Sequence, residues 1–152
     1  MGAAEQAKKE DFRIFIVEDD YIYNKLATLI TEEVVTTYNC PDLNFEIQAF
    51  TSAQECLQHL HKQPKIVLMD YFFEINGTNN ISTAVDLLGK MKKDCNDCEI
   101  IIVSSLTELN KIVELIEMGV HHFILKDHDS LSRLRFTLRN VVRDLVDKHY
   151  LT

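Results

Sequence analysis

Short apolar runs alternate along the chain with segments of helical periodicity, and this alternation restricts the fold more than any other feature of the sequence. Apolar runs of this length between turn signals are typical of strands. The expected strands are Phe12–Val17, Phe45–Phe50, Lys65–Asp70, Glu99–Ser104 and His121–Leu125. Five strands that alternate with five helices predict a doubly wound α/β domain with a parallel sheet, right-handed crossovers and helices on both faces.

Two of these strands can be placed within the sheet from their residue patterns. Residues 66–69 are apolar throughout, which is typical of a strand buried on both faces in the middle of a parallel sheet. Residues 45–50 alternate apolar and polar side chains, which favours an edge strand with one face toward solvent or a thin cover.

The segments between the strands carry apolar residues at spacings close to the helical period, so we expect each apolar stripe to face the core. The stripes are Ile22, Leu26, Leu29, Ile30 and Val34; Ala53, Cys56, Leu57 and Leu60; Ile81, Ala84, Val85, Leu88 and Met91; Leu109, Ile112, Val113 and Ile116; and Leu131, Leu134, Leu138, Val141, Val142 and Leu145. Ser52 and Glu55 have the capping-box spacing at the start of the second helix. Gly119 is expected to end the fourth.

Composition limits the domain organisation and the partners. The chain has 152 residues, of which 46% are hydrophobic, and this suits one compact domain over residues 12–148 with a disordered tail at 1–11 and a short tail at 149–152. A formal net charge of −8 argues against direct binding of nucleic acid, which needs clustered Lys and Arg. No apolar stretch approaches the roughly 20 residues that span a bilayer, and no signal-peptide core is present. The predicted location is the cytoplasm, with no membrane partner.

Polar side chains stand at the ends of four of the predicted strands. Glu18 and Asp19 follow the first strand, Asp70 ends the third, Ser104 ends the fourth and Lys126 follows the fifth. Because the carboxyl ends of parallel strands share one edge of the sheet, these side chains should converge although they are far apart in the sequence. Crowded carboxylates repel one another, and a hard divalent cation such as Mg²⁺ relieves that repulsion.

Carboxylates, a lysine and a small hydroxyl around a magnesium site are the groups that phosphoryl transfer requires. The metal and the ammonium group of Lys126 would neutralise the phosphoryl oxygens, and the hydroxyl of Ser104 would contact one of them. A carboxylate at the centre of the sheet edge would attack the phosphorus in line. Asp70 is therefore the predicted nucleophile.

Four segments that carry these residues together resemble the receiver domain of bacterial two-component response regulators. They are Val17–Asp20, Ile66–Asp70, Ile101–Ser105 and Gly119–Asp127, and the resemblance covers about residues 12–148. It implies a flavodoxin-like fold with strand order 2-1-3-4-5. It also implies that Asp70 accepts a phosphoryl group from a phosphohistidine on a sensor histidine kinase or a histidine phosphotransfer protein.

The same resemblance implies roles for the other residues of the site. Glu18, Asp19, Asp70 and the backbone carbonyl of Phe72 would hold Mg²⁺, Ser104 and Lys126 would bind the phosphoryl group, and Ser104 and Phe123 would form the switch. Asp20 falls outside the metal set and is expected to cap the first helix. The signal would pass to a downstream protein or an output domain through the fourth helix, the fifth strand and the fifth helix.

The chain departs from the family pattern just after Asp70. A Met-Pro pair is usual there, whereas this chain has Phe73-Glu74 followed by an Asn-rich stretch within a long predicted loop at 71–80. Asp127 replaces the Pro that commonly follows the Lys, and the aromatic switch residue is Phe123 rather than Tyr.

Two other functions remain open from the sequence. A phosphate-independent interaction module would keep the fold, although such modules tend to lose the acidic residues or the Lys. A Mg²⁺-dependent phosphohydrolase with an aspartyl nucleophile would use the same chemistry, but it normally has a second acid where Phe72 stands. We therefore expect a protein that catalyses only its own phosphorylation and dephosphorylation.

Cys95 and Cys98 have the C-x-x-C spacing without the context of a zinc site or a redox pair. A structural zinc site needs two more ligands, and a thioredoxin-like pair opens a helix after a strand, whereas this pair precedes a strand. We predict reduced thiols without a function, with oxidation of the pair as an incidental alternative.

Overall fold

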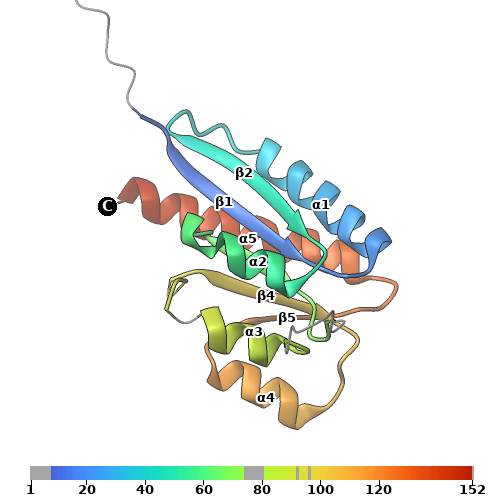
Figure 1. Ribbon diagram of the computed structural model, residues 1–152. Coiled ribbons are helices and arrows are strands. Elements are labelled where there is room, and N and C mark those ends of the chain that lie inside the picture. Colours follow the sequence, from blue (N-terminus) through green and yellow to red (C-terminus); the bar gives the residue numbers. More distant parts are fainter. Residues whose placement is uncertain (1–7, 74–80, 92, 96, 152) are drawn as a thin grey trace, which may run out of the picture.

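The computed structural model describes residues 8–73, 81–91, 93–95 and 97–151, which form a parallel five-stranded sheet covered by helices on both faces (Figure 1). The elements are β1 (Glu10–Val17), α1 (Tyr21–Thr36), β2 (Leu43–Phe50), α2 (Ala53–His59), the 3₁₀ turn η1 (Leu60–Lys62), β3 (Ile66–Met69), α3 (Ala84–Met91), β4 (Glu99–Ser104), α4 (Leu109–Glu117), β5 (His122–Leu125) and α5 (Ser130–Leu151). The strand order is β2-β1-β3-β4-β5, and every neighbouring pair is parallel. The predicted fold class and strand order are confirmed.

The register of the strands brings their carboxyl ends to one edge of the sheet. Val17 pairs with Phe50 on β2 and with Met69 on β3, and Met69 pairs in turn with Ile102 on β4. All four residues of the central strand β3 are buried, whereas β2 lies at the edge and has only its two end residues buried. Both predicted strand positions are therefore confirmed.

Successive residues of each inner strand enter two separate cores, one on each face of the sheet. Phe15 and Val17 of β1 pack with α2, α3 and Leu115 of α4. Ile14 and Ile16 of the same strand pack with α1 and α5 on the other face. This two-residue alternation explains why the inner strands are continuous apolar runs, since both faces are covered.

Several element bounds differ from the sequence prediction by a few residues. β1 begins at Glu10, so Glu10 and Asp11, which were expected in the tail, pair with Leu43 and Asn44 of β2. α3 begins at Ala84 rather than at Ile81, and α5 continues to Leu151. Most of the predicted loop after Asp70, residues 74–80, lies outside the described residues.

The predicted helix caps at Asp20 and Ser52 are confirmed. The Asp20 side chain accepts a hydrogen bond from the backbone N–H of Tyr23, and that of Ser52 accepts one from the backbone N–H of Glu55. Gly119 follows α4 with a φ of 95°, a conformation that side chains with a Cβ rarely adopt. Among the described residues, none of the helices has the length and apolarity that a membrane crossing needs.

The predicted buried faces of α1 and α4 are wrong in part. On α1, Ile22, Leu26 and Leu29 are exposed, and the helix instead buries Ala27, Ile30, Val34, Val35 and two polar residues, Asn24 and Thr31. Asn24 and Thr31 can be buried because both donate hydrogen bonds to backbone carbonyl groups. On α4, Leu109, Val113 and Ile116 are exposed, and Leu115 is the buried residue.

The prediction of reduced thiols at Cys95 and Cys98 is also wrong. The structure joins the two residues in a disulfide within the connection from α3 to β4. The two sulfur atoms can meet because the Cα atoms of the pair lie 5.5 Å apart, within the usual range for a disulfide. Cys40 and Cys56 remain free thiols.

Candidate functional site

The candidate site lies at the carboxyl edge of the sheet, where the parallel hydrogen bonding continues one residue beyond the strands. The backbone N–H of Asp70 donates to the carbonyl of Val17 at 3.2 Å, and that of Lys126 donates to the carbonyl of Ser104 at 2.8 Å. These bonds fix the first residue after β3 and after β5 in the register of the sheet. The side chains of Asp70 and Lys126 are thus positioned by rigid elements.

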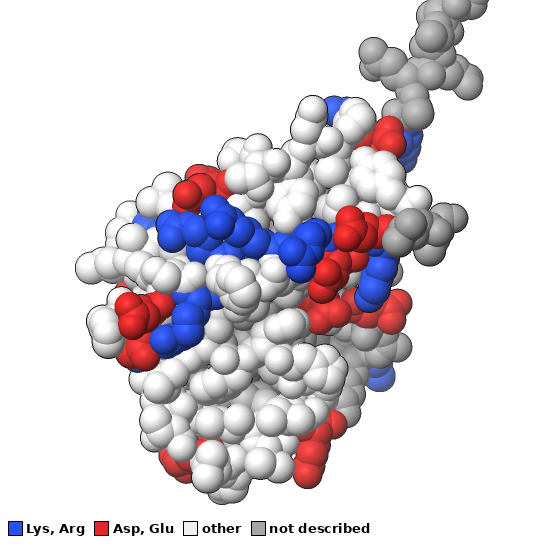
Figure 2. Space-filling view, turned by 180° about the vertical axis from the view of Figure 1, so that it is seen from behind, with Lys and Arg blue, Asp and Glu red and all other residues white. Residues whose placement is uncertain are grey.

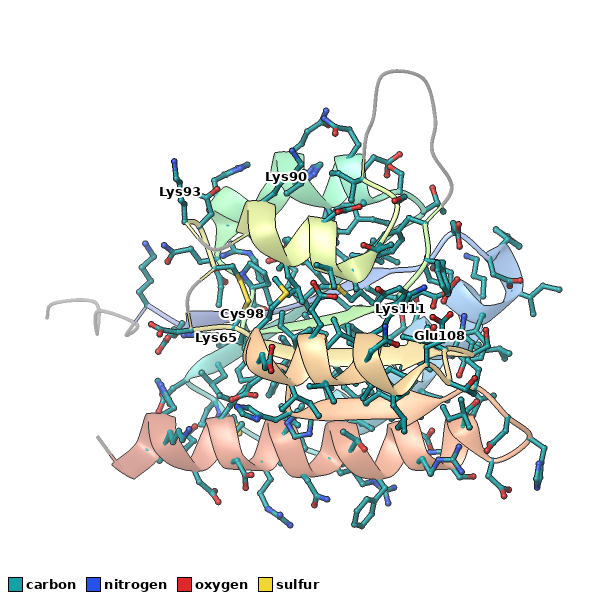
Figure 3. All side chains as sticks on the ribbon, turned by 90° about the horizontal axis from the view of Figure 1, so that it is seen from below. Lys65, Lys90, Lys93, Cys98, Glu108 and Lys111 are labelled. Atoms are coloured by element: carbon teal, nitrogen blue, oxygen red, sulfur yellow. A yellow bond between two sulfur atoms is a disulfide. The ribbon has the colours of Figure 1, made fainter. Side chains whose placement is uncertain are left out.

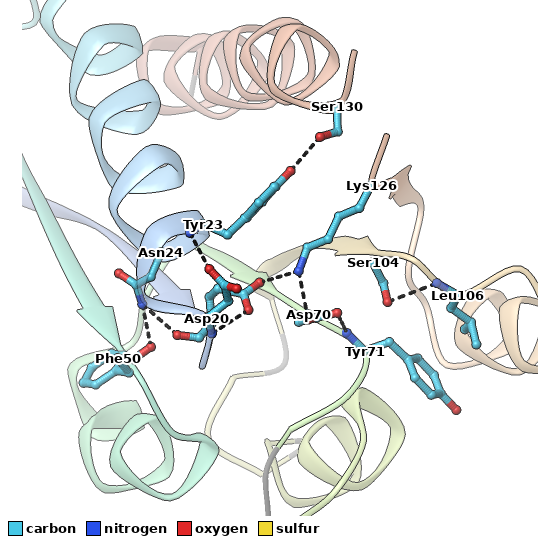
Figure 4. Close-up of polar contacts among 11 residues, drawn as sticks. Asp20, Tyr23, Asn24, Phe50, Asp70, Tyr71, Ser104, Leu106, Lys126 and Ser130 are labelled. Atoms are coloured by element: carbon cyan, nitrogen blue, oxygen red, sulfur yellow. Dashed lines mark hydrogen bonds and ion pairs between the residues drawn. The ribbon is translucent and has the colours of Figure 1, made fainter. Parts of the chain in front are cut away.

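The ammonium group of Lys126 lies between two carboxylates (Figure 4). Its Nζ donates to Oε2 of Glu18 at 2.9 Å and to Oδ2 of Asp70 at 3.0 Å. The side chain of Glu18 is only 5% exposed, that of Asp70 14% and that of Lys126 20%. Water screens this group of charges weakly, so their interactions are stronger than those of surface ion pairs.

Glu18, Asp19 and Asp70 have carboxylate oxygens that all lie within 4.8 Å of one another. Hard oxygen donors from carboxylates at such separations are the ligands that Mg²⁺ prefers, and Mg²⁺ keeps several waters when it binds few protein groups. The donor set therefore fits a divalent cation of this kind. The backbone carbonyl of Phe72 stays a predicted ligand.

Burial and neighbouring charges shift the protonation of this cluster. Loss of solvent raises the pKa of Glu18 to about 7, the nearby Asp70 charge adds to the increase, and the hydrogen bond from Lys126 opposes it. Burial acts to lower the pKa of Lys126, but its hydrogen bonds to Glu18 and Asp70 outweigh that effect and raise the pKa. Lys126 is therefore a permanent cation at neutral pH, whereas Glu18 titrates near neutrality.

Hydrogen bonds from the start of α1 hold Glu18 in place. Its Oε1 accepts a bond from the backbone N–H of Asp20 at 3.0 Å, and its backbone carbonyl accepts one from Nδ2 of Asn24 at 2.9 Å. The same amide group of Asn24 donates to the carbonyl of Phe50 at 3.0 Å and so joins the ends of β1 and β2. Asn24 is a site-supporting residue that the sequence did not predict.

Tyr23 and Ser130 are two further residues of the site that the sequence did not predict. The Nζ of Lys126 lies 4.5 Å from the centroid of the Tyr23 ring, within the range of a cation–π interaction. The hydroxyl group of Tyr23 shares a hydrogen bond of 2.8 Å with Oγ of Ser130 at the start of α5. The sequence indicates where α1 begins, because Asp20 caps the helix. It does not indicate that Ser130 of α5 lies beside Tyr23, because that contact depends on tertiary packing.

The predicted switch residues lie on neighbouring strands, but their side chains are directed into the protein. Ser104 is fully buried, and its Oγ accepts a hydrogen bond from the backbone N–H of Leu106 at 3.3 Å. Phe123 is partly buried and packs against the core that contains α2 and α3. The hydroxyl group of Ser104 is therefore already engaged with the backbone of the segment that follows β4.

Phe72, the residue after Tyr71, pairs with Thr83 in an isolated antiparallel bridge. Its side chain is 45% exposed and packs edge-on against Tyr71. The ammonium group of Lys111 lies over both rings, 5.9 Å from the centroid of Tyr71 and 5.4 Å from that of Phe72. The backbone N–H of Tyr71 donates to Oδ1 of Asp70 at 2.6 Å. The Tyr71–Phe72 pair is therefore adjacent to the candidate site.

Solved structures that include receiver domains are similar to the chain over most of its length. The N-terminal domain of an uncharacterized protein from Wolinella succinogenes is 22% identical, with a TM-score of 0.69 over 90% of this chain and 98% of that one. A receiver domain of a Francisella response regulator is 15% identical, with a TM-score of 0.67 over 88% and 98%. A response regulator receiver domain protein from Clostridium thermocellum is 16% identical, with a TM-score of 0.67 over 93% and 99%.

These likenesses establish the fold. No family model matches the chain, and no curated protein does either. The chain has the fold of response regulator receiver domains, which agrees with the resemblance seen in the sequence. The structure also brings Glu18, Asp19, Asp70 and Lys126 together at the edge of the sheet, as the strand ends predicted.

Proposed function

We propose that this protein accepts a phosphoryl group on Asp70 and uses it to switch a protein-interaction surface. The observation that carries the proposal is the position of Asp70, which lies beside the Lys126 ammonium group and within a cluster of oxygen donors that fits Mg²⁺. A carboxylate in this setting has a cation to balance the charge of an incoming phosphoryl group.

The proposed donor is a phosphohistidine. A carboxylate oxygen of Asp70 attacks the phosphorus, a P–O bond forms, the P–N bond to the imidazole breaks, and the imidazole takes up a proton. Mg²⁺ held by Glu18, Asp19 and Asp70 supplies positive charge to the phosphoryl oxygens when bound. Lys126 supplies a second positive charge, fixed in place by Glu18 and by the Tyr23 ring.

The exposed apolar stripe of α1 is the proposed docking surface for the phosphodonor protein. Ile22 is 70% exposed and Leu29 is 59% exposed, and with Tyr21 and Leu26 they form an apolar surface on the helix that begins just after the acidic residues. Monomeric proteins rarely expose so many large apolar residues together without a partner. A sensor histidine kinase or a histidine phosphotransfer protein that docks there would bring its phosphohistidine to Asp70.

The proposed output surface is formed by α4, β5 and α5. Leu109, Val113 and Ile116 of α4, Leu125 of β5 and Phe136 of α5 are all exposed apolar residues. Figure 2 shows a band of Lys and Arg across the back of the molecule, where α5 lies, and a largely uncharged region below it, where α4 lies. This surface would bind a downstream protein or an output domain.

The switch is proposed to begin at Ser104. A phosphoryl group on Asp70 adds negative charge and acceptor oxygens, which would draw the Ser104 hydroxyl away from the N–H of Leu106. Phe123 lies next to Ile102 on the neighbouring strand, so its packing would respond. A few charge-assisted hydrogen bonds of roughly 1.5 to 3 kcal/mol each are enough to shift such an equilibrium.

The proposal is tested by incubation of the protein with phosphoramidate and Mg²⁺, followed by intact mass measurement. Wild type should gain one phosphoryl group, and Asp70→Asn should gain none. Continuous release of phosphate from an ester substrate would favour a phosphohydrolase instead. A wild-type protein that binds partners but gains no label would show a phosphate-independent interaction module.

A further inference from the structure

The Cys95–Cys98 disulfide lies far from the candidate site. It belongs to the connection that follows α3 and leads into β4, at the amino edge of the sheet. Figure 3 shows Cys98 with Lys65 at one end of the molecule, and Glu108 and Lys111, which lie near the carboxyl edge, at the other. The proposed phosphorylation of Asp70 therefore does not use this pair of cysteines.

Both cysteines line an open cleft of about 910 Å³. This volume is in the range of sites that bind small molecules. Its walls carry cationic side chains, including Lys65 and Lys93, as well as acidic ones, including Asp94 and Glu99. A zwitterionic peptide thiol, which has carboxylate and ammonium groups, is complementary to a wall with charges of both signs.

Backbone carbonyl oxygens lie close to both sulfur atoms of the pair. The Sγ atom of Cys98 lies 3.1 Å from the carbonyl oxygen of Cys95, and Sγ of Cys95 lies 3.8 Å from the carbonyl oxygen of Pro64. These carbonyl oxygens are acceptors for the S–H groups that form when reduction breaks the disulfide and the two sulfur atoms move apart. The backbone N–H of Cys95 also donates to the carbonyl of Met91, which holds the loop to the end of α3 independently of the sulfur chemistry.

The buried thiol Cys56 provides a contrast within the same chain. Cys56 belongs to α2 and is fully buried in the core, and burial raises the pKa of its thiol to about 12. A thiol of this kind is inert because the thiolate is the reactive species. Cys95 and Cys98 are instead partly exposed and open to a cleft that a co-reactant can enter.

We propose that Cys95 and Cys98 form a reversible dithiol–disulfide site that exchanges with a low-molecular-weight peptide disulfide of the glutathione type. One cysteine thiolate attacks the small disulfide, a mixed disulfide forms and one small thiolate leaves. The second cysteine thiolate then attacks the bonded cysteine sulfur and releases the second small thiolate. Two electrons pass from the protein dithiol to the small disulfide, and an excess of the small thiol reverses both steps.

The disulfide cross-links two residues of the segment that connects α3 to β4. Ala84, the first residue of α3, donates its backbone N–H to the carbonyl of Tyr71, the residue after Asp70. The start of α3 is thus connected to the candidate site. β4 ends at Ser104. The disulfide thus lies between the far ends of two elements that reach the candidate site.

The test is equilibration of the folded protein in mixtures of reduced and oxidised glutathione, followed by acid quenching, alkylation and peptide mass mapping. In excess oxidised glutathione we expect Cys95 and Cys98 to lose their reactivity together as an intramolecular disulfide, and to regain it in excess reduced glutathione. Cys95→Ser should trap a mixed disulfide with one glutathione at Cys98. Cys40→Ser, which keeps the pair, should behave as wild type.

Other outcomes would overturn the proposal. The first is a wild-type pair that stays fully alkylatable in excess oxidised glutathione while the protein is folded. The second is a mixed disulfide that accumulates in wild type without closing to the intramolecular bond. Neither result bears on phosphorylation of Asp70, because that reaction is measured separately with the pair reduced.

Discussion

The site depends on a lysine that is shared by two carboxylates. The ammonium group of Lys126 donates hydrogen bonds of nearly equal length to Glu18 and Asp70, and it also contacts the face of the Tyr23 ring. The strand-end pattern predicted Glu18, Asp70 and Lys126, because the register of parallel strands follows from short apolar runs. Tyr23, Asn24 and Ser130 could not be predicted in the same way, since Asn24 depends on how α1 meets the ends of β1 and β2, and the other two depend on how α1 and α5 pack.

Replacement of the lysine should separate catalysis from metal binding. We expect Lys126→Met to slow phosphorylation by phosphoramidate by about a hundredfold, because a charge that stabilises the phosphoryl oxygens is lost. The affinity for Mg²⁺ should not fall, since both carboxylates lose a competing cation. The rate of mass gain and a Mg²⁺ titration measure the two effects.

Lys65→Met is the matched control for this substitution. Lys65 lies at the opposite edge of the sheet, where its ammonium group is 3.4 Å from Oε1 of Glu10. This variant should keep the wild-type rate of phosphorylation. An unchanged rate in Lys126→Met would show that the Lys126 charge is not used.

Magnesium affinity should depend on pH through Glu18. The pKa of Glu18 is raised from an ordinary 4.5 to about 7, so the folded protein holds a proton there below neutrality that a bound cation must displace. Affinity should therefore rise as pH rises through about 7, by roughly tenfold between about pH 6 and about pH 8. Calorimetric titration across this interval measures the effect.

Glu18→Gln provides the comparison for the pH effect. This variant should bind Mg²⁺ more weakly, because it loses a carboxylate ligand, and its affinity should change much less across the same interval. A pH dependence as steep as that of wild type would assign the titrating proton to another group.

At the scale of elements, the two helices whose buried faces were predicted wrongly are the two with exposed apolar stripes. On α1 the predicted stripe merged Ile30 and Val34, which are buried, with Ile22, Leu26 and Leu29, which are exposed. Periodicity gives the direction of an apolar stripe, but it cannot distinguish a stripe that packs on the sheet from one that awaits a partner. Asn24 and Thr31 are polar residues that the sequence pattern places outside the apolar stripe. They can be buried because their side chains donate hydrogen bonds to backbone carbonyl groups.

The exposed stripe of α1 gives a prediction for transfer between proteins. A Leu26→Glu, Leu29→Glu double substitution should leave the rate of phosphorylation by phosphoramidate within about twofold of wild type. The folded protein should be retained, since a surface substitution seldom changes the free energy of unfolding by more than about 0.5 kcal/mol. Transfer from a phosphorylated histidine phosphotransfer protein should slow by about tenfold or more, because docking is lost.

The matched control places the same charges on the other exposed stripe. Val113→Glu and Ile116→Glu on α4 should leave transfer from the phosphotransfer protein unchanged, because α4 is assigned to output. Equal rates for the α1 and α4 variants would contradict docking on α1.

The hydrogen bond between Tyr23 and Ser130 joins the starts of α1 and α5. We expect Tyr23→Phe to lower the free energy of unfolding by about 1 kcal/mol, because the buried Ser130 hydroxyl loses its partner while the ring over Lys126 remains. Urea unfolding of Tyr23→Phe, Ser130→Ala and the double variant measures the coupling between the two residues. If the change in the free energy of unfolding of the double variant equals the sum of the changes in the two single variants, the hydrogen bond does not stabilise the protein.

At the scale of the whole molecule, the fold follows from the order of apolar runs, and the position of the site follows from the fold. Once five strands lie parallel in the order β2-β1-β3-β4-β5, residues 18, 19, 70, 104 and 126 must meet at one edge. The disulfide did not follow from the same pattern, because its formation depends on the geometry of a single loop and on the redox conditions.

Phosphorylation of Asp70 is the central claim, and localisation of the label tests it most directly. After treatment with phosphoramidate and Mg²⁺, reduction with borohydride converts an aspartyl phosphate to homoserine, which peptide mass mapping can place in the sequence. We predict homoserine at position 70 in wild type, and at no position when Mg²⁺ is withheld. Homoserine at another aspartate, or a chain without any homoserine after full treatment, would contradict the assignment of Asp70 as the phosphoacceptor.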